Sequence, residues 1–152
     1  MRFRLIMVTV LCLVLTAPLN AEVVYPDVPL PEVLRLKGDM PSALRERVWS
    51  GRWRNPASPP EEGLNAVIIF EKVAGKKANI IYAYGNYPEL QIKPGWGRYT
   101  VDLVTNGNKL KFTFTSKLGH VLDFEAEGDK LKGSMRGKQV KIVMTPYELV
   151  NE

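Results

Sequence analysis

From residue 97 to residue 145, apolar and polar side chains alternate with a period of two, and glycine-containing dipeptides interrupt the alternation at short intervals. Such alternation is typical of strands that bury one face, and Asn106-Gly107, Gly128-Asp129 and Gly137-Lys138 are typical of hairpin turns. A hairpin turn fixes which residues lie opposite each other, so neighbouring strands can be tested for agreement on an inner face. This agreement constrains the fold more than any other feature of the chain.

The predicted registers place apolar residues opposite apolar residues and charges opposite charges. A turn at Asn106-Gly107 sets Leu103 opposite Leu110 and Asp102 opposite Lys111, and the next turn sets Glu125 opposite Lys132. Four consecutive ladders then share one apolar face, which predicts an antiparallel sheet with one face in water. That face consists of Tyr99, Val101, Leu103, Leu110, Phe112, Phe114, Leu122, Phe124, Ala126, Leu131, Gly133, Met135, Val140, Ile142 and Met144.

An all-β fold follows, and its most economical form is an eight-stranded antiparallel up-and-down barrel, because closure removes the exposed sheet edges. The barrel domain is expected at 48–146. Four prolines make residues 22–47 irregular, and a short N-terminal helical lead-in of one or two turns is predicted at 41–47. The eight predicted strands are 48–54, 64–73, 78–84, 97–104, 109–115, 121–127, 130–136 and 139–145.

The first 21 residues have the layout of a secretory signal peptide, with a cationic start, an apolar run at 5–15 and a breaker that ends at Ala21. A short uncleaved anchor is the alternative, although the run is shorter than the ~20 residues that cross a bilayer. Cleavage near Ala21 would remove Cys12, the one cysteine, together with Arg2 and Arg4, so the net charge falls from +5 to +3. We therefore expect a periplasmic or secreted protein without a stable membrane anchor, ending in a tail at 147–152.

The second and third predicted strands form a hairpin that is largely apolar on both faces, so periodicity leaves open which face points inward. If the face with Glu71, Tyr82 and Tyr84 points inward, these residues lie near the barrel mouth beside Trp53 or Trp96. That is the composition of a small-ligand pocket, and these five are the candidate ligand-binding residues. The alternative is that the tyrosines pack in the interior with their hydroxyls at the rim, while Glu71 pairs with a surface lysine.

Residue types that carry catalysis are scarce. His120 is the only histidine, it falls in a turn, and no serine-and-carboxylate pattern or second histidine accompanies it. No glycine-rich phosphate loop precedes a helix, and the lysines are spread over alternate outward positions rather than along one stripe. We expect a protein that is not an enzyme, with no catalytic residue, no metal, no cofactor and no nucleic-acid partner.

Gly51-Arg52-Trp53, at the start of the predicted meander, resembles the Gly-x-Trp motif in the first strand of the calycin group, which includes lipocalins, fatty-acid-binding proteins and avidins. In that group the tryptophan closes one end of the barrel and often packs on an arginine of the last strand, where this chain has Lys141. The segments "YAYG" and "PGWGRY" also resemble small secreted bacterial barrel domains of lipocalin-like type. The resemblance covers residues 43–146 and implies an eight-stranded ligand-binding barrel.

Two main functions stay open. The first is a secreted lipocalin-like barrel that binds a small apolar or amphipathic ligand without catalysis. The second is a filled barrel that acts as a protein-interaction or inhibitor module on an envelope protein through the 85–95 loop, which has the length of a segment that caps a barrel mouth. A carbohydrate-handling enzyme is a third possibility, for which the chain has no room. Whether the barrel interior is hollow or filled distinguishes the first two functions.

Overall fold

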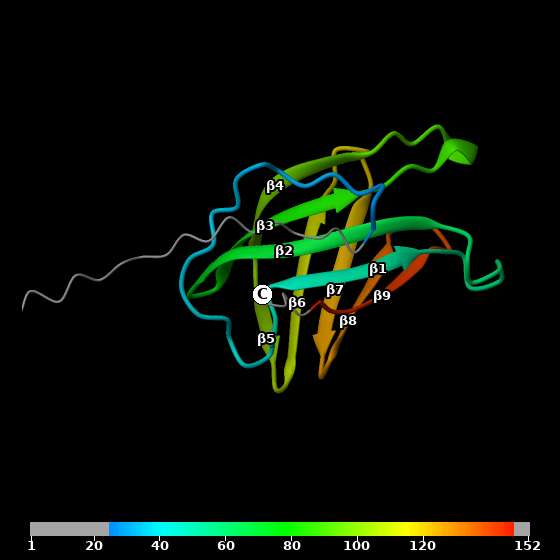
Figure 1. Ribbon diagram of the computed structural model, residues 1–152. Coiled ribbons are helices and arrows are strands. Elements are labelled where there is room, and N and C mark those ends of the chain that lie inside the picture. The colour runs from blue at the N-terminus through cyan, green and yellow to red at the C-terminus, as the bar shows by residue number, and fades with distance from the viewer. Residues whose placement is uncertain (1–24, 148–152) are drawn as a thin grey trace, which may run out of the picture.

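The computed structural model describes residues 25–147, so the predicted signal peptide at 1–21 and the tail beyond Tyr147 lie outside the described residues. Within 25–147, nine antiparallel strands form a nearly closed β-barrel in the order β4-β3-β2-β1-β9-β8-β7-β6-β5 (Figure 1). The strands are β1 (Val48–Trp53), β2 (Leu64–Ala74), β3 (Lys77–Tyr84), β4 (Gly95–Asp102), β5 (Val104–Asn106), β6 (Lys109–Thr115), β7 (Val121–Glu127), β8 (Lys130–Met135) and β9 (Lys141–Pro146), with one short 3-10 helix, η1 (Pro88–Leu90).

The described barrel has nine strands rather than the predicted eight, because the predicted strand 97–104 is divided between β4 and β5 at Leu103. β4 pairs with β3, whereas β5 pairs with β6, and the Leu103 N–H donates to the Lys76 carbonyl at 2.7 Å where the chain passes from one ladder to the other. Beyond this bend, side chains bridge β4 and β6. The rings of Tyr99 and Phe114 lie 4.8 Å apart between centroids, and the Tyr99 hydroxyl accepts the Lys117 N–H at 3.0 Å.

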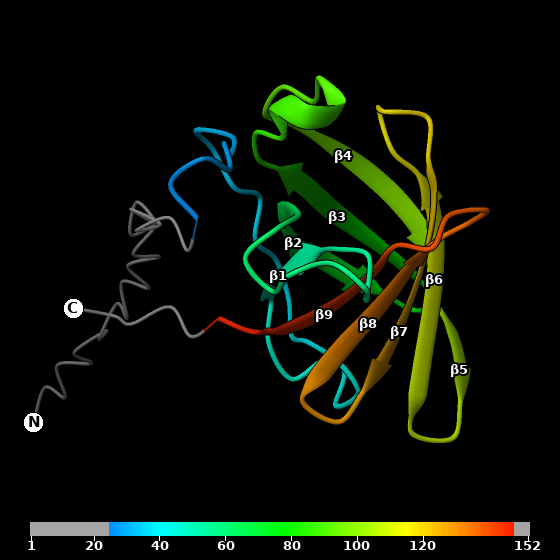
Figure 2. The same cartoon turned by 90° about the vertical axis from the view of Figure 1, so that its right-hand side faces the viewer.

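The helical lead-in predicted at 41–47 is wrong. In its place the chain makes a turn in which the Leu44 N–H donates to the Pro41 carbonyl at 2.8 Å. Packing explains the difference, because Leu44 is fully buried in the same core cluster as Trp49, whose indole N–H donates to the Glu46 carbonyl at 2.9 Å. Figure 2 shows this cyan segment at the end of the barrel where β5 turns into β6 and β7 into β8. The segment therefore covers that end.

Two-residue turns join the strands at this end of the barrel, which we call the turn end. Each has glycine at its first central position, with φ of 60° at Gly75, 61° at Gly107 and 62° at Gly128, as type II′ hairpins require. The predicted Asn106-Gly107 turn is therefore wrong by one residue, and Thr105 rather than Leu103 lies opposite Leu110. The residue opposite Leu110 is thus shifted by two positions from the predicted one. Because side chains alternate with a period of two, the same side chains still point inward.

The other predicted registers at the C-terminal side are confirmed. Glu125 lies opposite Lys132, and Gly133 lies opposite Ile142. The predicted inner face is confirmed as the core for most of its members, and the buried ones are Val101, Leu103, Leu110, Phe112, Phe114, Leu122, Phe124, Ala126, Leu131, Gly133, Ile142 and Met144.

A β-bulge at Glu71 decides which face of the second hairpin points inward. Phe70 pairs with Ile80 and Lys72 pairs with Asn79, so Glu71 is an extra residue without a partner in the ladder. One additional residue reverses the alternation of β2 on one side of the bulge. The side chains that join the barrel core are Ala66, Ile68, Phe70, Ile80, Tyr82 and Tyr84, and those on the outer face are Val67, Ile69, Ile81 and Ala83.

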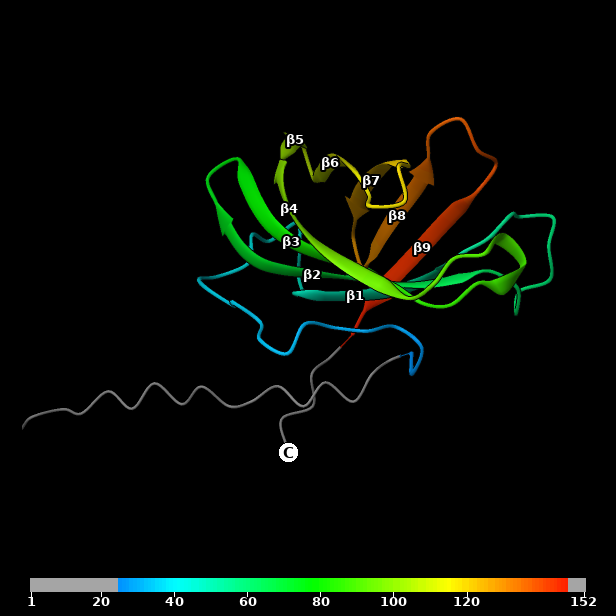
Figure 3. The same cartoon turned by 90° about the horizontal axis from the view of Figure 1, so that it is seen from above.

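Residues 25–37, which we call the N-terminal strap, cover this outer apolar face. Val28 is buried there, and Leu30, Leu34 and Leu36 pack against the same cluster. Figure 3 shows the strap (blue) on the side of β1 and β2 that faces away from β6, β7 and β8. Both faces of the hairpin are thus buried, which is why its sequence lacks a polar face.

Hydrogen bonds fasten the strap at both ends. The Asp27 carboxylate accepts the Asn65 amide at 3.1 Å and the Asn86 N–H at 3.0 Å. The Lys37 N–H donates to the Glu71 carbonyl at 2.8 Å. In the middle, Arg98 donates to the Val33 carbonyl at 2.7 Å and to the Glu71 carboxylate at 3.1 Å. Arg98 therefore connects the bulge to the strap.

Arg98→Met should destabilise the fold by about 2 kcal/mol, because it leaves the Glu71 carboxylate, only 4% exposed, without its counter-charge. This expected loss of stability is smaller than the loss on breaking a fully buried ion pair, because the Arg98 side chain is 30% exposed. Urea denaturation measures the loss. Adding Glu71→Gln to Arg98→Met should restore part of the stability.

The matched control is Lys77→Met, which breaks the 2.7 Å pair between Lys77 and Asp102, whose side chains are 67% and 77% exposed. This pair takes the place of the predicted pairing of Asp102 with Lys111. Its loss should change stability by about 0–0.5 kcal/mol. Equal effects of the two methionine variants would contradict the role assigned to Arg98.

Candidate functional site

The end of the barrel opposite the turn end, which we call the loop end, carries the longer connections at 54–63, 85–94, 116–120 and 136–140. Figure 2 shows the connections β3–β4 and β6–β7 at the top and the tight turns at the bottom. All four connections contribute residues to a cavity of about 260 Å³ at the loop end. The cavity volume lies just below the ~300–1,000 Å³ of drug-sized ligand pockets.

An aromatic core fills the barrel beneath this cavity. The rings of Phe112 and Phe124 stack with their centroids 5.3 Å apart, and Phe114 stacks on Phe124 at 6.0 Å. Trp53 lies edge-on to Phe124 at 5.7 Å and also lines the cavity, so it forms the boundary between the two regions. The interior is therefore filled toward the turn end and hollow at the loop end.

Tyr82 is the central polar residue of the cavity wall. Its hydroxyl oxygen accepts the indole N–H of Trp53 at 3.0 Å, and both side chains are almost completely buried. Burial raises the pKa of Tyr82 well above its ordinary value, and the hydrogen bond from Trp53 offsets only part of this effect. The phenol therefore keeps its proton, for which no residue in 25–147 provides a hydrogen-bond acceptor.

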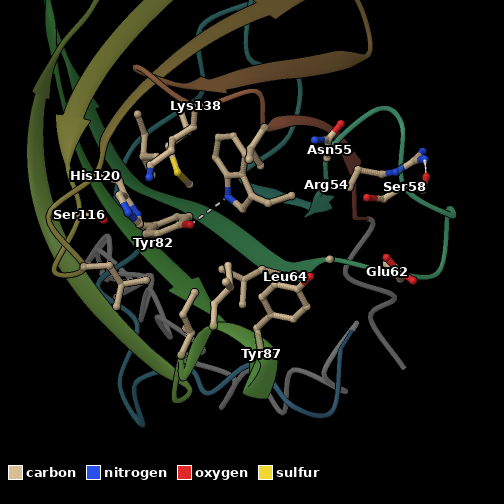
Figure 4. Close-up of a pocket in the computed structure, with 18 residues that line it drawn as sticks. Arg54, Asn55, Ser58, Glu62, Leu64, Tyr82, Tyr87, Ser116, His120 and Lys138 are labelled. Atoms are coloured by element: carbon tan, nitrogen blue, oxygen red, sulfur yellow. Dashed lines mark hydrogen bonds between the residues drawn. The ribbon is translucent and has the colours of Figure 1, made fainter.

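Ser116, His120 and Lys138 lie on the same side of the cavity as Tyr82 (Figure 4). The turn after β6 is held by its backbone, since the Ser116 N–H donates to the His120 carbonyl and the Gly119 N–H donates to the Ser116 carbonyl, both at 2.9 Å. The Ser116 side chain is buried and makes no hydrogen bond within the described residues. We call these four residues the polar side of the cavity.

Apolar side chains form the remaining wall, and the 85–94 connection supplies three of them. Tyr87 and Ile92 pair through two backbone hydrogen bonds of 3.0 and 3.1 Å, which hold η1 and Leu90 at the tip. Leu90 is 67% exposed although it also lines the cavity. The apolar wall consists of Leu64, Tyr87, Leu90, Ile92, Leu118, Leu122, Met135 and Val140.

The third group of lining residues lies in the 54–63 connection and uses most of its polar atoms locally. Arg54 donates from Nη2 to the Ser58 carbonyl at 2.6 Å, and the Asn55 side chain accepts the Ala57 N–H at 3.0 Å. The Arg54 Nε is buried and has no hydrogen-bond partner within the described residues. Figure 4 shows Arg54, Asn55, Ser58 and Glu62 on the side of the cavity away from His120. These residues form a rim rather than a second polar wall.

Of the five residues predicted from the sequence, the structure brings together Trp53, Tyr82 and Tyr84. Tyr84 lies behind Tyr82, with ring centroids 5.7 Å apart, and covers Gly95 instead of lining the cavity. Glu71 and Trp96 lie on the outer face of the sheet. Glu71 pairs there with Arg98 rather than with a lysine.

Trp96 packs under the strap, opposite Ala83. Its ring has Arg98 at 5.3 Å and Lys117 at 5.6 Å from the ring centroid, which is the geometry of cation–π contacts. Trp96 therefore belongs to the packing between sheet and strap.

Ser116, Lys138 and Leu90 are not among the residues predicted from the sequence, and His120 was considered only as a catalytic residue. One signal could have found them. In an up-and-down barrel alternate connections lie at the same end. When β4 and β5 are counted as one strand, every second connection between residues 48 and 146 is longer than two residues. The lining residues lie in or beside those longer connections.

Within residues 25–147, no group of three or more histidine, cysteine, aspartate and glutamate side chains is placed to hold a metal ion. The same part of the chain has no helix that is both long enough and apolar enough for a membrane span.

Tyr82→Phe should destabilise the fold by about 1–2 kcal/mol, because it leaves the buried Trp53 N–H without an acceptor. The matched control is Tyr99→Phe, since the Tyr99 hydroxyl accepts an exposed backbone N–H that water can satisfy. Denaturant titration should show a smaller loss for the control. Losses of the same size would show that the bond between Tyr82 and Trp53 does not stabilise the fold.

Tyr82 should also make stability depend on alkaline pH. Because its pKa is raised in the folded state, the unfolded chain releases this proton first, and stability falls as pH rises above about 10. Urea denaturation midpoints measured at pH 9 and pH 11 should show a larger loss of stability for the wild type than for Tyr82→Phe. An identical loss in both proteins would contradict the raised pKa.

Compared with known proteins, the chain matches no family model, and no curated protein or solved structure matches it either.

Proposed function

We propose that this protein is a non-catalytic binding barrel that takes a small apolar or amphipathic ligand into the loop-end cavity. The observation that carries the proposal is a cavity above a close-packed aromatic core, with mostly apolar walls and a few convergent polar groups. This combination is typical of small-ligand sites. Because the volume is only about 260 Å³, the ligand is small or inserts one end.

The lipocalin-like assignment and the location are parts of the same proposal. The Gly51-x-Trp53 motif in β1 and the nearly closed antiparallel barrel support the first. The cationic start and apolar run of residues 1–21 support export to the periplasm or beyond. A binding protein of this kind would work where apolar small molecules pass through an aqueous compartment.

Leu90 supports a second function, in which the 85–95 loop binds an envelope protein. A large apolar side chain that is 67% exposed at the tip of a structured loop is suited to a protein contact. The cavity and the loop tip are adjacent, so the test must separate them.

Native mass spectrometry of the protein purified from its own envelope fraction is the test. The wild type should carry a reproducible bound mass that is lost on denaturation. Val140→Trp should lower its occupancy at least about tenfold, because the indole fills the cavity from the end of the 136–140 connection.

The matched control is Val143→Trp, since Val143 lies three residues further along, in β9, and is 51% exposed on the outside. This variant should keep the bound mass. Equal occupancy in Val140→Trp would place the ligand outside the cavity. A wild type without bound mass, together with a protein cross-linked through position 90, would favour the second function.

A further inference from the structure

We propose that the ligand is a short- or medium-chain monocarboxylate, whose carboxylate lies against the polar side of the cavity at Tyr82, Ser116 and Lys138. This inference rests on the proposed function and names its ligand class. The alkyl or aryl part would lie against the apolar wall formed by Tyr87, Leu90 and Ile92.

Two hydroxyl groups at the cavity are hydrogen-bond donors without an acceptor. Tyr82 is 2% exposed and Ser116 is 5% exposed, and neither hydroxyl proton has an acceptor within the described residues. Buried polar groups in folded proteins are almost always paired. The two donors therefore indicate that an oxygen acceptor completes the site.

The charge beside these hydroxyls favours an anionic acceptor over a neutral one. Lys138 lies on the polar side, whereas Glu62 lies with Arg54 on the opposite rim (Figure 4). Lys138 makes no ion pair among the described residues, in contrast to Lys132, which lies 3.5 Å from Glu127. Hydrogen bonds that a charged group accepts are about twice as strong as neutral ones.

The number of donors points to a carboxylate rather than a phosphate. Two hydroxyls and one ammonium match the two oxygens and single charge of a carboxylate, whereas a phosphate presents more oxygens and nearly two charges. Restricted volume and the adjoining apolar wall select a monoacid with a short chain.

Isothermal titration calorimetry with four octyl probes tests the head group: octanoate, octan-1-ol, octylamine and octyl phosphate. Octanoate should bind at least about tenfold more tightly than octan-1-ol. Octylamine should bind more weakly than octan-1-ol because of Lys138. Octyl phosphate binding more tightly than octanoate would overturn the carboxylate assignment.

Two variants locate the carboxylate. Ser116→Ala and Lys138→Met should each weaken octanoate binding several-fold and leave octan-1-ol binding unchanged. Ser116→Ala keeps the backbone hydrogen bonds of its turn. The matched controls are Thr115→Ala, at the neighbouring exposed position, and Lys130→Met, at the turn end. Equal weakening by Lys130→Met would show attraction by net charge and overturn the site.

The outcomes separate this inference from the proposed function. If octan-1-ol binds as tightly as octanoate and Val140→Trp blocks both, the cavity binds apolar chains and the carboxylate inference is wrong. If none of the four probes binds more tightly to the wild type than to Val140→Trp, both proposals are wrong.

Discussion

The burial of both faces of the β2–β3 hairpin is the constraint on which the rest of the structure depends. Inside, Ile68, Phe70 and Tyr82 join the barrel core, while the strap covers the outer face. The Glu71 bulge makes both arrangements possible, since one extra residue turns Phe70 inward and sends the carboxylate outward to Arg98. Residues 25–147 contain no cysteine, and this second apolar layer adds stability of the kind that disulfides supply in many small secreted domains.

The β2–β3 hairpin also positions the candidate site. Because the alternation of β3 continues unbroken from Ala78 to Tyr84, Tyr82 reaches the interior at the level of Trp53. Their hydrogen bond lies where the aromatic core ends and the cavity begins. Two-residue turns and Leu44 close the other end, so the cavity inside the barrel lies where the connections are long enough to surround a space.

Much of the fold could be predicted from the sequence, because period-two alternation and turn residues act locally. The strand positions and the inner face from β6 to β9 were predicted in this way. Two local signals failed. The β5–β6 turn is formed by Gly107 and Asn108 rather than by Asn106 and Gly107. The turn at 41–47 is set by a tertiary contact, the burial of Leu44, instead of by helix propensity.

Residue type and spacing by themselves determined most of the strand positions and the apolar face from β6 to β9. Only the tertiary structure decided the inner face of β2, the separation of Glu71 and Trp96 from the cavity, and the approach of Ser116 and Lys138 to Tyr82. The physical reason is that a bulge and a covering strap are long-range packing solutions. Residues 34 positions apart in the chain, such as Tyr82 and Ser116, become neighbours only when the barrel closes.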